Sequence, residues 1–104
     1  MPTTDILGEL WEVIDDRFEH PSQKSYVSQL VSGEKGSDRV LEKIGEEATE
    51  FVIAVKNREP SRIISVAADL QFHLMIALRA SGVTFQDVLD ELSSRRREPG
   101  HPDR

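Results

Sequence analysis

Apolar residues recur at intervals of three and four along most of the chain, which is the spacing of one face of an α-helix. The first such run extends from Asp5 to about Phe18, and Pro21 follows it. A short apolar segment from Ser25 to Val31 favours one or two further helical turns over an extended conformation. No segment alternates between apolar and polar residues as a half-buried strand does, so the sequence predicts an all-α protein.

Two longer periodic segments form the middle of the chain. The first begins after a cap at Ser37 or Asp38 and runs to about Lys56, and the second extends from Pro60 to Ala80. Because only a few residues separate them, the two helices are expected to pack as antiparallel neighbours. The second helix carries apolar residues almost all the way around, which predicts a buried central helix.

The C-terminal part contains one more predicted helix and a tail. Gly82 suits the end of the preceding helix, and Thr84 is expected to cap a last helix from Phe85 to about Arg95. Residues 98–104 are expected to be a disordered tail. We therefore expect one all-α domain over residues 1–97, in which a helical hairpin is completed into a bundle by dimerisation, because so short a chain cannot cover every apolar face.

Composition excludes several classes of function. The net charge of −6 argues against binding to a nucleic-acid backbone, and an anionic substrate would need local positive charge or a metal ion. The absence of cysteine excludes a disulfide framework and a thiolate metal site. No basic segment followed by an apolar run stands at the N-terminus, and nowhere are there 18 consecutive apolar residues. We expect a cytoplasmic protein with no membrane or nucleic-acid partner.

Three glutamates crowd one sector of the first long helix, at the edge of its apolar stripe. They are Glu46, Glu47 and Glu50, and a like-charge pair one turn apart costs a helix roughly 0.2–0.5 kcal/mol. Asp69 is the only acid within the apolar second helix, where an unpaired charge would cost several kcal/mol. Counted from the turn, Asp69 and Glu50 lie at similar distances and are expected to meet. The alternative is an ordinary solvated acidic face.

These four acids form an all-oxygen set of the kind that binds Mg²⁺, or Mn²⁺ as an alternative. Such an ion neutralises polyphosphate charge and lowers the pKa of a bound water, which a spare glutamate can orient or deprotonate. The positive charge for an anionic substrate could come from Lys24, Lys35 and Arg39. His73 lies one turn after Asp69 and could bond to it or to a substrate phosphate, although a packed histidine explains the position equally well.

The string KIGEEATEFVIAVKN, followed by AADLQFHLMIALRASGVTFQDVLDEL, resembles the phosphoribosyl-ATP pyrophosphohydrolase family. SYVSQL and GEKGSDRVLEKIGEEATE extend the resemblance over about residues 7–95. The pattern Glu-Glu-x-x-Glu alone is shared by the wider all-α, MazG-like superfamily of nucleoside triphosphate pyrophosphohydrolases. The resemblance implies a helical homodimer that uses Mg²⁺ to split the α–β phosphate bond of phosphoribosyl-ATP, giving phosphoribosyl-AMP and pyrophosphate, in the second step of histidine biosynthesis.

The resemblance also implies roles for individual residues. The three glutamates match catalytic acids of the family, and Ser25 and Tyr26 fall in its substrate-side segment, although a turn with a core tyrosine explains them equally well. The implied metal ligands are Glu46, Glu47, Glu50 and Asp69, and the implied substrate contacts are Lys43, Ser25, Tyr26 and His73.

One position departs from the family pattern, which commonly has a glutamate three residues before the aspartate. Val66 stands there in this chain, so the site lacks one carboxylate. A glutamate introduced at this position would tighten metal binding if it faces the acids and would destabilise the fold if it faces the core. Two alternative functions remain open: a house-cleaning nucleoside triphosphate pyrophosphohydrolase and a non-catalytic helical dimerisation module.

Overall fold

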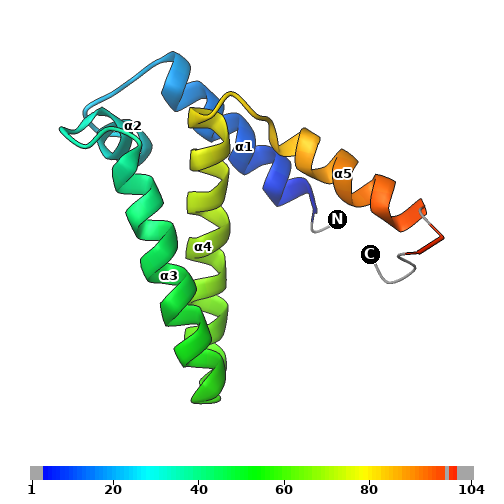
Figure 1. Ribbon diagram of the computed structural model, residues 1–104. Helices are drawn as coiled ribbons and strands as arrows, with labels where there is room; N and C mark the ends of the chain where they lie inside the picture. Colours follow the sequence, from blue (N-terminus) through cyan, green and yellow to red (C-terminus); the bar gives the residue numbers. More distant parts are fainter. Residues whose placement is uncertain (1–3, 98, 101–104) are drawn as a thin grey trace.

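The structure is a computed structural model that describes residues 4–97 and 99–100. The described residues form five α-helices and no strand, which confirms the predicted all-α class (Figure 1). Of the predicted tail, Pro99 and Gly100 are described and exposed, and the rest lies outside the described residues. The helices are α1 (Thr4–Glu19), α2 (Tyr26–Ser32), α3 (Asp38–Lys56), α4 (Pro60–Ala80) and α5 (Phe85–Arg97).

The helix ends agree with the predictions to within two residues, but one predicted cap does not form. The Thr84 hydroxyl accepts a hydrogen bond from the Asp87 backbone N–H, and the Asp87 carboxylate accepts one from the Thr84 N–H, both at 3.0 Å. Gly82 has a φ of +78°, a conformation that glycine adopts freely at a helix end. Ser37 makes no capping bond, because its φ of −67° and ψ of −15° are helical and a capping residue is normally extended.

The core lies at the end of the α3–α4 hairpin away from its turn, where α1 and α2 cover it (Figure 1). At the rim of this region Phe85 of α5 stacks on Trp11 of α1, with the ring centroids 6.4 Å apart. Helices α1 to α4 each contribute at least one of the buried side chains of the core cluster, which are Ile14, Val27, Val40, Met75 and Ile76.

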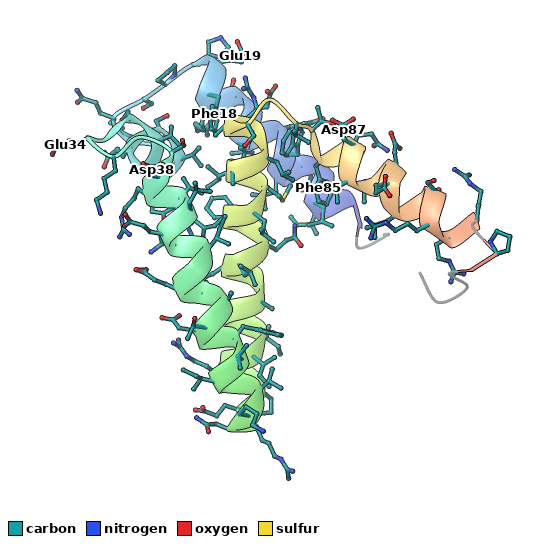
Figure 2. All side chains as sticks on the ribbon, in the orientation of Figure 1. Phe18, Glu19, Glu34, Asp38, Phe85 and Asp87 are labelled. Atoms are coloured by element: carbon teal, nitrogen blue, oxygen red, sulfur yellow. The ribbon has the colours of Figure 1, made fainter. Side chains whose placement is uncertain are left out.

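A polar clamp ties the C-terminal part of α4 to α1. Arg79 Nε donates to Asp15 at 2.7 Å, and Nη2 donates to Glu19 at 2.8 Å. The guanidinium also lies over the ring of Phe18, 4.9 Å from its centroid, near the end of α1 that carries Glu19 (Figure 2). Because the planar guanidinium is held both at its edge and on its face, it restrains α1 relative to α4.

The contact line between α3 and α4 repeats every seven residues. Its buried positions include Val40, Glu47 and Ala54 on α3, and Val66 and His73 on α4. A step of seven keeps the same side of a helix facing its neighbour. Because the helices run in opposite directions, Val66 lies level with Ala54 where His73 lies level with Glu47. The seam is therefore apolar except for the layer that contains Glu47 and His73.

The half of the hairpin nearest the turn projects beyond the other helices (Figure 1). Ile64 is 70% exposed there, and Val52 is 59% exposed. The radius of gyration is 15.5 Å, whereas a compact chain of this length has about 13 Å. The prediction of a buried central α4 is therefore wrong for the described part of the chain, because α1 and α5 lie beside the C-terminal half of α4 and leave the half near the turn exposed (Figure 1).

Val66 is 2% exposed and lies in this seam, so the position faces α3 rather than open solvent. We predict that Val66→Glu lowers the melting temperature of the metal-free protein by roughly 10 °C or more, since a buried unpaired charge costs several kcal/mol. Circular dichroism in EDTA measures this. Ser65→Glu adds the same charge at an exposed neighbour and should melt near the wild type. An unchanged melting temperature, or tighter Mn²⁺ binding by Val66→Glu, would show that the position faces the acids.

Candidate active site

Glu47 is buried, whereas Glu46 and Glu50 in the same cluster are exposed. Its Oε1 atom lies 2.8 Å from His73 Nδ1, but that ring nitrogen is hydrogen-bonded to the Asp69 backbone carbonyl, also at 2.8 Å. Glu47 Oε1 consequently has no hydrogen-bond partner among the described residues. A buried carboxylate oxygen without a donor is costly, and it is the kind of ligand that a hard cation prefers.

The ring of His73 is 4% exposed and has partners at both nitrogens. Because a carbonyl can only accept, Nδ1 carries a proton and donates to Asp69. Nε2 lies 2.8 Å from the Tyr26 hydroxyl, which donates to it when the ring is neutral. Phe72 packs on both rings, with centroids 6.1 Å from Tyr26 and 5.3 Å from His73. A direct contact between His73 and a substrate would require one of these bonds to break.

The other three predicted metal ligands are not gathered around Glu47. The Glu50 carboxylate lies 3.5 Å from the guanidinium of Arg62, with which it forms an ion pair. The Asp69 side chain is exposed, because the neighbouring half of the hairpin is uncovered and lacks the apolar surroundings predicted for it. Among the described residues, no three acidic or histidine side chains converge closely enough to hold a metal ion.

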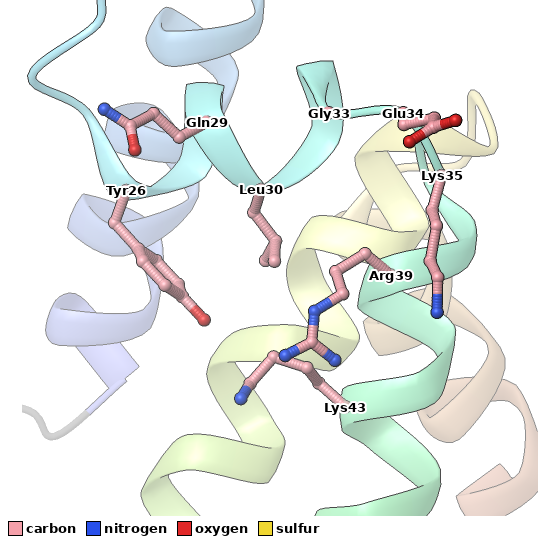
Figure 3. Close-up of a pocket in the computed structure, with 8 residues that line it drawn as sticks. All are labelled: Tyr26, Gln29, Leu30, Gly33, Glu34, Lys35, Arg39 and Lys43. Atoms are coloured by element: carbon pink, nitrogen blue, oxygen red, sulfur yellow. The ribbon is translucent and has the colours of Figure 1, made fainter.

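A pocket of about 400 Å³ opens between α2 and the start of α3. Tyr26 is 51% exposed and borders this pocket as well as His73. In Figure 3 the side chains of Arg39 and Lys43 extend from α3 into the space toward which the Tyr26 hydroxyl points. The pocket therefore brings positive charge next to the Tyr26–His73 pair. Its lining residues are Tyr26, Gln29, Leu30, Gly33, Glu34, Lys35, Arg39 and Lys43.

The three cations of this pocket differ in their pairing. Lys35 donates to Glu42 at 2.8 Å, and Arg39 Nη1 lies 3.5 Å from the same carboxylate. The hydrogen bond from Lys35 lowers the pKa of the Glu42 carboxyl, so this acid stays charged and partly compensates both cations. Lys43 has no ion-pair partner in the part of the chain that the structure describes. Its ammonium is therefore the charge most available to an anion.

Ser25 shapes the N-terminus of α2. Its hydroxyl accepts a hydrogen bond from the Ser28 backbone N–H at 3.1 Å, which is a helix cap. The Ser28 hydroxyl in turn donates to the Arg17 carbonyl at 3.1 Å and so attaches α2 to the end of α1. The structure thus gives Ser25 a role in orienting the helix that presents Tyr26, while its predicted contact with substrate stays a prediction.

The sequence pointed to Glu47 and His73 separately but not to their contact. A signal was available in the seven-residue step, since Glu47 lies midway between Val40 and Ala54 and shares their buried line. On the helical wheel all three glutamates border the apolar stripe, so the wheel alone did not separate buried Glu47 from exposed Glu46 and Glu50.

Comparison with known proteins gives the family. The phosphoribosyl-ATP pyrophosphohydrolase family matches residues 7–96. The chain is 58% identical over 92 residues to a phosphoribosyl-ATP pyrophosphatase of Methanoculleus marisnigri, covering 88% of this chain and 95% of that protein. It is 57% identical over 97 residues to the protein of that name in Methanosphaerula palustris, covering 93% and 98%.

The chain is also similar to part of a longer, bifunctional protein. Over 94% of its length the chain is 46% identical to the histidine biosynthesis bifunctional protein HisIE of Prochlorococcus marinus, of which it covers 43%. The matches to the single-function proteins span nearly the whole of both chains and include the acidic helix and the pocket. The chain belongs to the phosphoribosyl-ATP pyrophosphohydrolase family.

Proposed function

We propose that this chain hydrolyses the bond between the α and β phosphates of phosphoribosyl-ATP, giving phosphoribosyl-AMP and pyrophosphate in the second step of histidine biosynthesis. The observation that carries the proposal is the cationic pocket, which the Tyr26–His73 pair connects to the buried carboxylate of Glu47. Family membership and the names of the relatives support the same substrate. We also infer a cytoplasmic location, as expected of a biosynthetic enzyme.

We further propose Mg²⁺, with Mn²⁺ as an alternative, held by Glu46, Glu47, Glu50 and Asp69. The donor chemistry fits, because Glu47 Oε1 is buried without a hydrogen-bond partner and the other three carboxylates are exposed and able to change rotamer. When bound, the ion would neutralise phosphate charge and lower the pKa of a coordinated water.

The remaining steps belong to the side chains of the chain itself. Lys43 and Arg39 bind the phosphate oxygens by charge, in a pocket whose volume is in the range of small-molecule sites. Whichever of the exposed carboxylates of Glu46 and Glu50 is free of the ion orients the attacking water and accepts its proton. In this arrangement the proposed ion would offset the repulsion between the carboxylates of the acidic cluster.

Removing a single charge from the cluster tests the catalytic role. We predict that Glu47→Gln and Glu50→Gln each lower metal-dependent turnover about 100-fold or more, because each keeps the side-chain size and removes a ligand or a base. Turnover is measured by identifying phosphoribosyl-AMP and pyrophosphate released from phosphoribosyl-ATP. Circular dichroism should show unchanged helicity.

Glu59→Gln is the matched control, because this exposed acid in the α3–α4 turn lies outside the cluster and makes no capping bond. If all three variants have wild-type turnover, the acids of the cluster have no catalytic role and the alternative of an ordinary acidic face holds. Hydrolysis of ATP or dNTPs in preference to phosphoribosyl-ATP would indicate a house-cleaning hydrolase. Absence of both turnover and a thermal shift with Mg²⁺ would indicate a non-catalytic dimerisation module.

The pocket cation supplies a separate prediction. Lys43→Met should raise KM for phosphoribosyl-ATP at least about tenfold with a smaller change in kcat, since a hydrogen bond to a charged group contributes about 1.5–3 kcal/mol. Lys56→Met removes the same charge at the exposed far end of α3 and should leave KM unchanged. If both variants have the wild-type KM, the phosphates bind elsewhere.

We infer a homodimer through the long helices. The apolar surface of α4 would also suit a membrane span by length and composition, but exposed Asp69 in the middle of the helix would then be placed in lipid at high cost. A second copy presents the same apolar surface and forms a self-complementary interface. The exposed apolar side chains of the hairpin are Leu41, Val52, Ile53, Val55, Ile64 and Leu74, between 41% and 70% exposed.

Charge placed on this surface should separate the subunits. Ile64→Lys and Val52→Lys are each expected to raise the dissociation constant of the dimer about 100-fold or more, because a symmetric interface loses each apolar side chain twice. Sedimentation at micromolar concentration measures the effect. Val13→Lys, at an exposed apolar position of α1, is the control and should remain dimeric. Sedimentation of the wild-type chain as a monomer would contradict the inference.

A further inference from the structure

We propose that Tyr26 and His73 are positioning residues that hold the Glu47 carboxylate in the orientation in which it binds the metal ion. The inference rests on the proposed function in one respect, since it takes Glu47 as a metal ligand. It changes the role of two residues that the family resemblance assigned to the substrate. The basis is a chain of three side chains from three helices, each within 2.8 Å of the next.

The first link is the edge of the imidazole ring. Glu47 Oε1 receives no hydrogen bond among the described residues, so no donor of the chain fixes its direction. The polar atom in contact with it is His73 Nδ1, at 2.8 Å. The Nδ1–H group already donates its hydrogen bond to the Asp69 carbonyl. The ring therefore limits where Glu47 Oε1 can lie by contact alone, and it does not occupy a lone pair of that oxygen. The ring edge therefore restricts the positions open to this oxygen and leaves its lone pairs available to a cation.

The second link is the pair of bonds that stops the ring from turning. The Asp69 carbonyl is part of the α4 backbone and provides a rigid acceptor for Nδ1. The Tyr26 hydroxyl holds the opposite nitrogen, Nε2, from α2. Phe72 packs against both rings and limits their sideways movement. The imidazole against which Glu47 Oε1 lies is thus fixed by the α4 backbone on one side and by the Tyr26 side chain of α2 on the other.

The third link joins this arrangement to the anion pocket. Tyr26 is half-exposed on the side that lines the pocket with Arg39 and Lys43, while its hydroxyl contacts buried His73 (Figure 3). The same residue therefore borders the place proposed for the phosphates and restrains the carboxylate proposed for the ion. Removing the Tyr26 hydroxyl alone should let the His73 ring move more freely, while the aromatic ring at position 26 keeps its packing against Phe72.

A purely structural role is the competing explanation. A buried polar layer in an apolar helix seam can set the register of two helices without any part in chemistry. In that case variants at Tyr26 and His73 would lower the melting temperature and leave metal affinity unchanged. Metal affinity measured without substrate therefore separates the two explanations.

The experiment is calorimetric titration of the full chain with Mn²⁺ alone, for the wild type, Tyr26→Phe, His73→Asn and His73→Gln. The amide nitrogen of asparagine can take the place of Nδ1, whereas that of glutamine takes the place of Nε2. His73→Gln should weaken Mn²⁺ binding about 10–100-fold, the range typical for groups that orient a ligand. His73→Asn should weaken Mn²⁺ binding several-fold less than His73→Gln does, and Tyr26→Phe should weaken it about tenfold. In turnover, kcat should fall in the same order with KM nearly unchanged.

Equal Mn²⁺ affinity in all four proteins would overturn the inference, whatever their melting temperatures. It would also be overturned if Tyr26→Phe raised KM with Mn²⁺ affinity unchanged, because Tyr26 would then bind the substrate. Wild-type protein that binds no Mn²⁺ would overturn the inference together with the metal assignment. If the wild type binds Mn²⁺ but does not hydrolyse phosphoribosyl-ATP, the proposed function fails, and the order of Mn²⁺ affinities still decides whether His73 and Tyr26 position Glu47.

Discussion

Glu47 lies between α3 and α4, where a charged carboxylate costs several kcal/mol unless a partner offsets its lost hydration. The contact with His73 is available in one register of the hairpin only. A shift of one turn would place Glu47 opposite Asp69 in one direction or Ile76 in the other, and away from the imidazole of His73 in both. The register that brings the two residues together also aligns Ala54 with Val66, so the polar layer and the apolar packing depend on each other.

The same layer determines where the candidate site lies. His73 is held at its second nitrogen by Tyr26, which attaches α2 to the hairpin beside the first turns of α3. The pocket exists because α2 lies there, capped by Ser25 and bonded through Ser28 to the end of α1. The half of the hairpin beyond this layer is not covered by α1, α2 or α5, and it presents the apolar side chains that we assign to a second copy (Figure 1).

Helical periodicity was sufficient to predict the elements of this fold, because apolar residues recur at helical spacing and proline, glycine or polar residues mark the breaks between the helices. It was insufficient for the contacts between helices. Ser37 has the right chemistry for a cap but a helical backbone, and Glu50 is ion-paired with Arg62, a contact that the sequence did not indicate. Such contacts depend on rotation and register, which only packing decides. Asp69 is exposed in the single chain, and the proposed second copy would change its surroundings in a way that one chain's sequence does not describe.

Val66 lies in the seam between α3 and α4, so the residue at this position affects both the packing of the two helices and the charge near Glu47. The family pattern commonly has a carboxylate here, and in this chain the position is 2% exposed and level with Ala54, below the Glu47 layer. A second carboxylate between the same two helices would repel Glu47 whenever no cation is present, since like charges in a poorly solvated space disfavour each other's ionised form. Valine removes that repulsion and extends the apolar packing by one layer. We infer that valine at this position favours the metal-free hairpin, and that Glu47 and the residues around it would carry more of the proposed metal binding.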